Sequence, residues 1–397
     1  MNNLKNSLIT HLECSFCGKV HDADELNTVC KKCGKVLYPR YDLEKGKECI
    51  TPNSLRLRKT YNLWRFHEIM PVKQEKYRIS LGEGWTPLIH LKNLGEKMGL
   101  KELYLKDEGQ NPTGTFKSRG LCAAVAKGIE LGVKEFSMPT AGNAGAALAA
   151  YTAHARVKSH IFAPKDTDEF IQVEMKAMGA DLTLVNGLIT DAGAEAKKIG
   201  IENGWFDVST LKEPYRIEGK KTMGLELAEH FEWGLPDVII YPTGGGTGIV
   251  GMWKAFTELE ELGLIGHERP KMISVQPVGC QPIVRAFENG DEFAGTWPNA
   301  TSKFGGIRVP SAIGDYLILR AIRESHGTAI AVADIHTHES MLKLAKHEGI
   351  MIAGEAAATI AALEKLNDNG FVDKTQKIVL FGTGSGLVTP SLWSSSP

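Results

Sequence analysis

The sequence predicts an α/β protein whose sheets are mainly parallel, and three observations support this. Short runs of β-branched and apolar residues alternate with longer alanine-rich segments that have helical periodicity. Glycine-rich turns follow several of the predicted strands and lead into predicted helices. Among the 397 residues, 43% are hydrophobic and 23% are charged, which is typical of a globular protein with substantial cores.

The alternation of strands and helices begins near Leu81. Strands are expected at residues 102–105, 159–163, 238–241, 272–275 and 378–381. Helices are expected at residues 121–132, 144–155 and 353–366. Strands joined by helical crossovers pair in parallel, so this order favours parallel sheets over sandwiches or bundles.

We expect four parts along the chain. Residues 1–40 form a small cysteine-bearing module, and residues 41–78 form a charged and aromatic connecting arm. Residues 79–124 and 226–397 are expected to form a large α/β domain, and residues 125–225 a small α/β domain between them in sequence.

Composition argues against several function classes. The formal net charge is −1, so no global field attracts nucleic acid or an anionic membrane. No run of about 18 apolar residues predicts a membrane span. The polar start of the sequence does not resemble a signal peptide, so a cytoplasmic location is expected.

Four cysteines form two pairs near the N-terminus. Cys14-x-x-Cys17-Gly and Cys30-x-x-Cys33-Gly are separated by twelve residues. Each pair aims two thiolates at one point, and four thiolates close a tetrahedral zinc site with no open position. This spacing favours a structural zinc ribbon over four unligated thiols, and His21 is expected to be solvated. No basic and aromatic stripe accompanies it, which favours a structural cap over a nucleic-acid module.

Lys117 lies in the segment 111–120, at a turn from a predicted strand to a predicted helix. Taken alone, such a lysine is usually a solvated surface charge. Three further glycine-rich loops, at residues 139–145, 242–248 and 382–386, also follow predicted strands. Successive N–H groups in such turns bind phosphate, although none of these loops has a Walker or dinucleotide pattern. Four such loops together favour a ligand over tight packing alone.

Through these loops, the sequence resembles the fold-type II pyridoxal-phosphate enzymes, most closely the threonine synthase family, over about residues 80–390. The family's Gly-Glu-Gly-x-Thr-Pro-Leu segment matches residues 82–88, and its Asn-Pro-Thr-Gly-Ser-Phe-Lys-Asp-Arg-Gly segment matches residues 111–120. The resemblance implies a two-domain, tryptophan synthase beta-like fold. Several threonine synthases also begin with a cysteine-rich ribbon.

The resemblance also implies roles for individual residues. It places the cofactor's Schiff base on Lys117, the ring hydroxyl at Asn143 and the ring nitrogen at Thr383. The implied phosphate loop consists of Gly244, Gly245, Gly246, Thr247 and Gly248. Residues 213–222 resemble the family's Asn-Pro-Tyr-Arg-x-Glu-Gly-Gln-Lys-Thr, which makes Arg216 a substrate contact, and Thr140 is the other.

The sequence departs from the family at several of these positions. Ser118 replaces the aspartate after the lysine, and Glu213 replaces an asparagine. Ala141 and Ala144 replace hydroxyl residues that help to bind a substrate carboxylate, and Leu211 stands where a small polar residue is usual. The phosphate loop also reads Gly-Gly-Gly-Thr-Gly where threonine synthases commonly have Gly-Asn-Ala-Gly-Asn. Cofactor binding is still expected, whereas these changes leave the identity of the substrate open.

Two reactions of this fold therefore stay open. A threonine synthase converts O-phosphohomoserine and water to threonine and phosphate, whereas a serine or threonine dehydratase-like ammonia-lyase needs no phosphate site. A non-enzymatic zinc-ribbon binding protein is a remote third reading. The expected partner is a small amino-acid substrate, the expected assembly is a homodimer, and neither nucleic acid nor a membrane is expected to bind.

Overall fold

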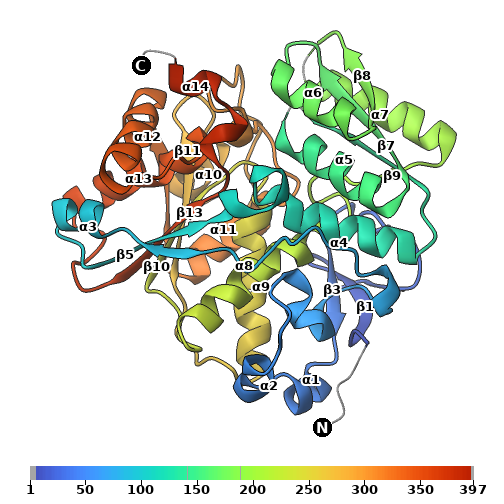
Figure 1. Cartoon of the computed structure of the whole chain (residues 1–397), viewed down its shortest axis with the longest axis horizontal. Coiled ribbons are helices and arrows are strands. Elements are labelled where there is room, and N and C mark those ends of the chain that lie inside the picture. The colour runs from blue at the N-terminus through green and yellow to red at the C-terminus, as the bar shows by residue number, and fades with distance from the viewer. Residues whose placement is uncertain (1–5, 141, 188, 395–397) are drawn as a thin grey trace. The chain divides into compact units, whose positions relative to one another are not determined.

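The computed structural model describes residues 6–140, 142–187 and 189–394. Ala141, one of the departures named above, lies outside the described residues. The chain divides into two compact units (Figure 1). Unit 1 comprises Met1–Trp85, Lys117–Leu225 and Thr257–Leu264, and unit 2 comprises Thr86–Phe116, Glu226–Phe256 and Ile265–Pro397. The domain boundaries expected from the sequence stay a prediction.

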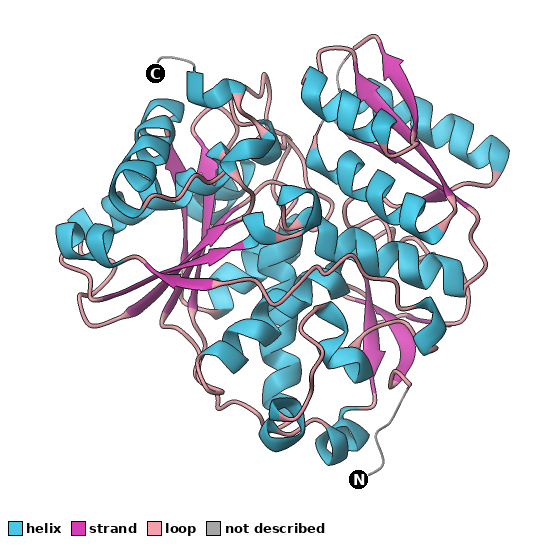
Figure 2. Cartoon of the chain, in the orientation of Figure 1, coloured by secondary structure: helices cyan, strands magenta, loops and turns pink. Residues whose placement is uncertain are grey.

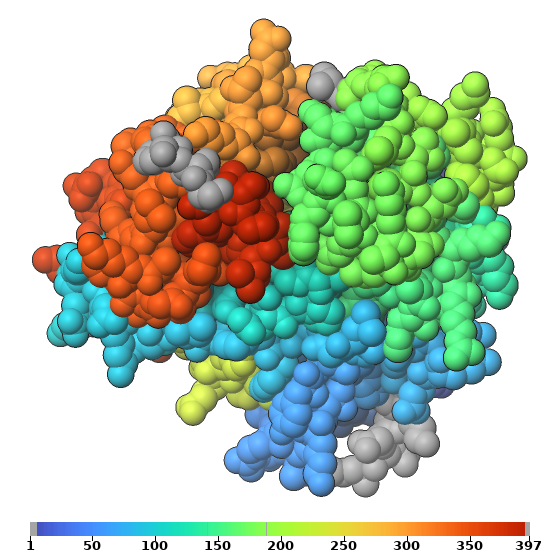
Figure 3. All heavy atoms as spheres, turned by 45° about the horizontal axis from the view of Figure 1, so that its top comes forward, coloured from blue at the N-terminus to red at the C-terminus, as the bar shows by residue number. Residues whose placement is uncertain are grey.

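Unit 1 begins with a three-stranded antiparallel sheet in the order β2-β1-β3. Its strands are β1 (Ile9–Cys14), β2 (Val20–His21) and β3 (Leu37–Tyr41). The arm that follows contains α1 (Leu43–Cys49), α2 (Pro52–Arg56) and the 3-10 helices η1 (Leu63–Ile69) and η2 (Glu75–Tyr77). In the space-filling view, the arm (medium blue) forms part of the visible surface (Figure 3).

The rest of unit 1 is built on a parallel sheet in the order β8-β7-β6-β9. Its strands are β6 (Glu135–Pro139), β7 (Lys158–Pro164), β8 (Asp181–Val185) and β9 (Phe206–Asp207). The helices are α4 (Lys117–Glu130), α5 (Asn143–Ala155), α6 (Glu169–Ala177) and α7 (Ile189–Asn203). Helices α5 and α7 both pack against β6 and β7, on opposite faces of the sheet (Figure 2). This α/β arrangement buries the small side chains of α5 against its neighbours.

Unit 2 contains a six-stranded sheet in the order β12-β11-β10-β13-β5-β4, in which only β4 is antiparallel to its neighbour. Its strands are β4 (Leu88–His90), β5 (Glu102–Asp107), β10 (Val238–Pro242), β11 (Lys271–Pro277), β12 (Thr328–Val332) and β13 (Lys377–Gly382). Helix α13 (Gly354–Asp368) packs across β10 to β13, where its alanines are buried in an apolar core of this unit.

The other helices of unit 2 are α3 (Lys92–Met98), α10 (Pro282–Asn289), α11 (Asp315–Glu324), α12 (Asp334–Glu348) and α14 (Ser391–Ser394). Four short 3-10 helices lie in its loops, at Glu108–Gln110, Pro112–Gly114, Gly305–Ile307 and Gly386–Val388. Helices α8 (Arg216–His230) and α9 (Thr247–Glu261) contribute residues to both units.

The predicted α/β class is confirmed, and each strand and helix expected from the sequence is present. The main difference is the start of α4, which begins at Lys117 itself and not near Leu121. No helix of the described residues is long and apolar enough to cross a membrane.

Candidate active site

Lys117 is the first residue of α4, and its side chain is half-buried. The start of α4 is fixed against α8 because the two backbones approach closely at two glycines. A Cβ on Gly219 would lie 2.0 Å from the carbonyl oxygen of Arg119, and a Cβ on Gly120 would lie 2.9 Å from that of Arg216. Unit 1 therefore brings together the helices that carry Lys117 and Arg216.

Thr140 and Asn143 lie at the carboxyl end of β6 and the start of α5. Thr140 is buried, and its hydroxyl accepts a hydrogen bond from Gly142 N at 3.2 Å and donates one to Gly142 O at 3.3 Å. Asn143 is the first residue of α5 and is half-buried. Gly145 must be glycine because a Cβ would lie 2.7 Å from Cγ2 of Thr140. The loop thus presents a hydroxyl, an amide and a helix N-terminus at one end of the parallel sheet.

Arg216 is the first residue of α8 and is fully buried. Its Nη1 donates to the carbonyl oxygen of Val208 at 2.7 Å. Its Nε and Nη2 have no hydrogen-bond partner among the described residues. A buried guanidinium with two open donors is costly, and an anion bound beside it would satisfy them.

A buried carboxylate, Glu83, holds the Gly-Glu-Gly segment against α4 and α5. It accepts hydrogen bonds from the Tyr151 hydroxyl at 2.5 Å and from Cys122 Sγ at 3.2 Å. Burial, together with the charges of Cys122 and Glu83, raises the pKa of Tyr151, which is also hydrogen-bonded to Ser118. Ser118, the residue after the lysine, is therefore tied into this network through a tyrosine.

In unit 2, the loop 244–248 joins β10 to α9. Gly246 has a φ of +76°, and a Cβ there would lie 2.2 Å from Ile318 Cδ1. A Cβ on Gly244 would lie 2.5 Å from the carbonyl oxygen of Gly306. In the described part of the chain, the amides of Gly244, Gly245 and Gly246 donate to no backbone carbonyl. Such amides, beside the N-terminus of α9 at Thr247, have the arrangement that binds phosphate.

Thr383 follows β13 and is buried. Its carbonyl oxygen accepts a hydrogen bond from Phe116 N at 3.0 Å, and Gly114 O accepts one from Ser385 N at 2.8 Å. The loop that precedes the lysine is thereby anchored to the loop that carries Thr383. Both pairs lie within unit 2.

The four N-terminal cysteines lie together, with all four Sγ atoms within 4.8 Å of one another. The Sγ atoms of Cys14 and Cys33 are 3.4 Å apart, and those of Cys17 and Cys30 are 3.7 Å apart. Zinc–sulfur bonds of about 2.3 Å in a tetrahedron place sulfurs about 3.8 Å apart, so the cluster fits zinc.

The structure corrects the expectation for His21, which is buried and hydrogen-bonded to Cys30. Burial tends to raise the pKa of the Cys30 thiol. Hydrogen bonds from the backbone of Cys33, from His21, from the backbone of Lys32 and from Cys14 outweigh it and lower that pKa to about 6. Burial and the neighbouring thiols raise the pKa of Cys33 in the same cluster, so the four thiols do not all ionise readily without a metal.

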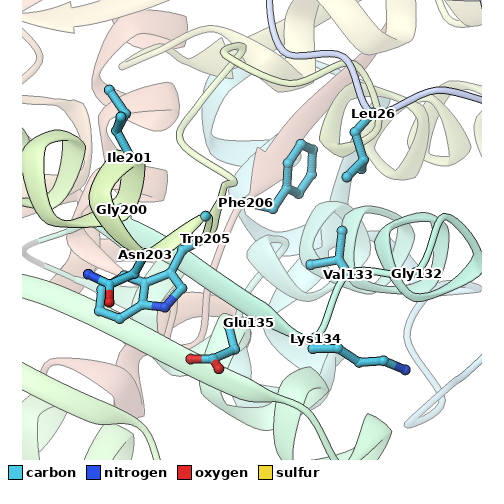
Figure 4. A pocket seen from close by; sticks show the side chains of 11 residues that line it. Leu26, Gly132, Val133, Lys134, Glu135, Gly200, Ile201, Asn203, Trp205 and Phe206 are labelled. Atoms are coloured by element: carbon cyan, nitrogen blue, oxygen red, sulfur yellow. The ribbon is translucent and has the colours of Figure 1, made fainter.

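A separate hollow of about 480 Å³ lies in unit 1, between the end of α7, β6 and β9 (Figure 4). Its lining includes Val133, Glu135, Trp205 and Phe206. The Trp205 ring is stacked on His160, with the ring centroids 3.5 Å apart. None of the site residues predicted from the sequence lines this hollow.

Sequence reasoning missed two features of the site. One is the set of partners that bury Glu83, although the Gly-Glu-Gly motif had drawn attention to that segment. The other is Glu213, whose carboxylate accepts hydrogen bonds from Tyr215 N at 2.7 Å and from Arg216 N at 3.1 Å. The departure from asparagine at this position was the available signal.

Comparison with known proteins identifies the family. The model of the pyridoxal-phosphate dependent enzyme family matches residues 79–384. Threonine synthase of Methanocaldococcus jannaschii is 36% identical, over 95% of this chain and 92% of that protein. Threonine synthase of Methanosarcina acetivorans is 34% identical, over 96% of this chain and 92% of that protein.

Solved structures support the same fold. Maize serine racemase matches with a TM-score of 0.67 at 21% identity, over 78% of this chain and 90% of that one. Threonine deaminase isoform 2 from Solanum lycopersicum matches with a TM-score of 0.63 at 19% identity, over 76% of this chain and 83% of that one. The fold is thus that of fold-type II pyridoxal-phosphate enzymes. Together with the two relatives, this shows that the chain belongs to the threonine synthase family of pyridoxal-phosphate-dependent enzymes.

Proposed function

We propose that this enzyme converts O-phosphohomoserine and water to threonine and phosphate. The observation that carries the proposal is the buried Arg216, whose Nε and Nη2 have no partner among the described residues. Glu213 and Asp207 compensate part of the charge of Arg216, and the phosphate of the substrate would satisfy its two open donors. The chain also matches threonine synthases over most of its length.

In this proposal, three groups of residues hold the cofactor. The loop Gly244–Gly248, including Gly245 and Thr247, binds its phosphate through backbone amides. Asn143 and Thr383 contact the ring, and Lys117 forms the covalent link. A hydroxyl at Thr383 accepts or donates a hydrogen bond without adding a charge at the ring nitrogen.

When bound, pyridoxal phosphate withdraws electrons from the Cα atom of an amino acid attached to it. The residues of this chain then have defined tasks. The amine of Lys117, released by the incoming substrate, takes the proton from Cα. Thr140 would turn its hydroxyl from the carbonyl oxygen of Gly142 to the substrate carboxylate, and Arg216 would bind the distal phosphate.

Arg216→Ala tests the substrate contact. The variant is expected to raise KM for O-phosphohomoserine and to leave the cofactor's visible absorbance unchanged. A lost contact to a charged oxygen group costs about 2 kcal/mol, which corresponds to a roughly thirtyfold loss in kcat/KM. Arg156→Ala, at the C-terminal end of α5 and outside the proposed site, is the control. Equal values of KM and kcat/KM for the Arg216 and Arg156 variants would show that Arg216 does not contact the substrate.

A substrate profile of the wild-type enzyme tests the reaction itself. We expect phosphate release from O-phosphohomoserine and no comparable ammonia release from serine or threonine. The reverse result, ammonia without phosphate, would favour the dehydratase-like reaction, for which the loss of hydroxyls at Ala141 and Ala144 is the supporting observation.

We further propose that Cys14, Cys17, Cys30 and Cys33 hold a structural zinc ion. Four thiolates leave no open coordination position, so the ion stabilises the ribbon and takes no part in the chemistry. Cys30→Ser is expected to lower the zinc content and the thermal stability of the N-terminal module while sparing most of the turnover per bound cofactor. Elemental analysis and activity normalised to cofactor check this, with Cys280→Ser as the matched control. Turnover that falls in proportion to zinc in a folded enzyme would contradict it.

We also propose a cytoplasmic homodimer that binds neither nucleic acid nor membranes. The support for the compartment is the proposed zinc site, because a cluster of four cysteine thiolates is typical of proteins whose cysteines are not oxidised to disulfides. Sedimentation at several protein concentrations tests the assembly.

A further inference from the structure

The side chain of Glu213 folds back onto the start of α8. It is 1% exposed, and its Oε2 accepts hydrogen bonds from Tyr215 N at 2.7 Å and from Arg216 N at 3.1 Å. The first amides of a helix have no intrahelical partner and carry the positive end of its dipole, so they attract anions. In this protein the carboxylate of Glu213 accepts hydrogen bonds from these amides.

Arg216 supplies a second and independent observation. Its guanidinium is buried, with Nη1 bonded to the carbonyl oxygen of Val208 and with Nε and Nη2 unpartnered among the described residues. Glu213 and Arg216 attract one another electrostatically, but the carboxylate's hydrogen bonds go to backbone amides and not to the guanidinium. The two open donors are therefore available to an anion, and an anion bound there would lie near the carboxylate of Glu213.

We propose that Glu213 is a specificity-determining residue that competes with the anionic distal group of the substrate for the positive charge of Arg216. This inference rests on the proposed function, because the distal group is taken to be a phosphate. The threonine synthase pattern has a neutral asparagine at this position, so Glu213 adds one negative charge to the site. Binding of a phosphorylated substrate should consequently depend on whether this carboxyl is protonated.

The groups around Glu213 determine how substrate binding should change with pH. Burial raises the pKa of Glu213 to about 7, Arg216 and the amides of Tyr215 and Arg216 act against it, and Asp207 adds to the increase. Asp207, at the end of β9, and Arg216, on α8, are the charged side chains that act on the carboxyl. At a pH below its pKa, Glu213 is neutral and does not compete with the substrate phosphate for Arg216. At a pH above its pKa, the carboxylate is ionised and repels the phosphate. A phosphate monoester keeps most of its second negative charge above about pH 6, so substrate affinity should fall as the pH rises through the pKa of Glu213.

The test compares wild-type enzyme with Glu213→Gln, which keeps an oxygen for the helix amides and loses the charge. We expect the wild-type KM for O-phosphohomoserine to rise between about pH 6.5 and about pH 8, with kcat changing much less. The variant should have a KM about tenfold lower at the higher pH and should lack this dependence. Glu174→Gln, on α6 and outside the site, should behave as the wild type. The same pH dependence of KM in wild type and Glu213→Gln would overturn the proposal.

Sulfate binding separates this proposal from the proposed reaction. Sulfate has a constant charge over this pH range, and its dissociation constant can be measured on the cofactor-loaded enzyme without turnover. We expect wild-type enzyme to bind sulfate more weakly at about pH 8 than at about pH 6.5. Glu213→Gln should bind sulfate equally at the two pH values, and Glu213→Asn replaces it if the first variant does not fold. If sulfate binds as expected but O-phosphohomoserine is not turned over, the proposed reaction is wrong and the role of Glu213 still holds. Sulfate binding that is independent of pH in the wild type would reject the role of Glu213.

Discussion

Lys117→Ala is expected to abolish the covalent link to pyridoxal phosphate and to reduce turnover by several orders of magnitude. The lysine supplies both the attachment point and the amine that accepts the Cα proton, so no other single substitution should cost as much. Purified wild-type enzyme should absorb in the visible, and borohydride should fix the cofactor to a peptide that contains Lys117. The variant should lose both signals.

The control for this experiment is Lys158→Ala, which removes an exposed lysine of the same unit and should leave absorbance and activity unchanged. Lys220 is the competing candidate, because it is fully buried and its Nζ lies 3.3 Å from where a Cβ on Gly120 would stand. A borohydride-fixed cofactor that persists in Lys117→Ala would show that the assignment to Lys117 is wrong.

Lys221→Met is expected to lower the free energy of unfolding by about 3–5 kcal/mol, because it leaves buried carboxylates without their cation. The ammonium of Lys221 lies 2.6 Å from Glu218 and 2.8 Å from Glu258, and it also donates to the carbonyl oxygen of Ile69 at 2.5 Å. Burial disfavours the charged lysine, but Glu218 and Glu258 outweigh this effect and raise its pKa. Tyr41, the last residue of β3, donates its hydroxyl to Glu218 at 2.6 Å.

Chemical denaturation measures this loss, with Lys47→Met as the control. Lys47 forms an exposed pair with Glu44 at 2.7 Å, and the loss of such a pair should cost about 1 kcal/mol or less. Because the cluster joins the ribbon and the arm to α8 and α9 within unit 1, Lys221→Met should also increase proteolysis of the N-terminal module. Similar denaturation midpoints for the two variants would contradict a stabilising role for the buried cluster.

The elements that could be predicted from the sequence are those encoded by local patterns. The strands 238–241 and 378–381 were recognisable from their buried β-branched runs, and the spacing of Cys14, Cys17, Cys30 and Cys33 predicted that the thiols would meet. Family motifs pointed to Lys117, but the start of α4 at this residue was not evident, because the residue before it is Phe116, which is not one of the residue types that signal a helix start.

Features that depend on tertiary contacts could not be predicted. Charged residues are usually exposed, so nothing local marks Glu83, Glu218 or Lys221 as fully buried. The partners of Glu83 are 39 and 68 residues away in sequence, at Cys122 and Tyr151. His21 was expected to be solvated for the same reason, since its contact with Cys30 arises only when the ribbon folds.

The most direct test of the proposed reaction is turnover of O-phosphohomoserine in water labelled with heavy oxygen. Elimination breaks the bond between Cγ and oxygen, and water then adds at Cβ. The proposed reaction should therefore give threonine that carries one labelled oxygen in its side chain, and an equal amount of phosphate without label. Homoserine with labelled phosphate would indicate phosphatase chemistry, and ammonia with a keto acid would indicate an ammonia-lyase. Either product pattern would contradict the assignment as a threonine synthase.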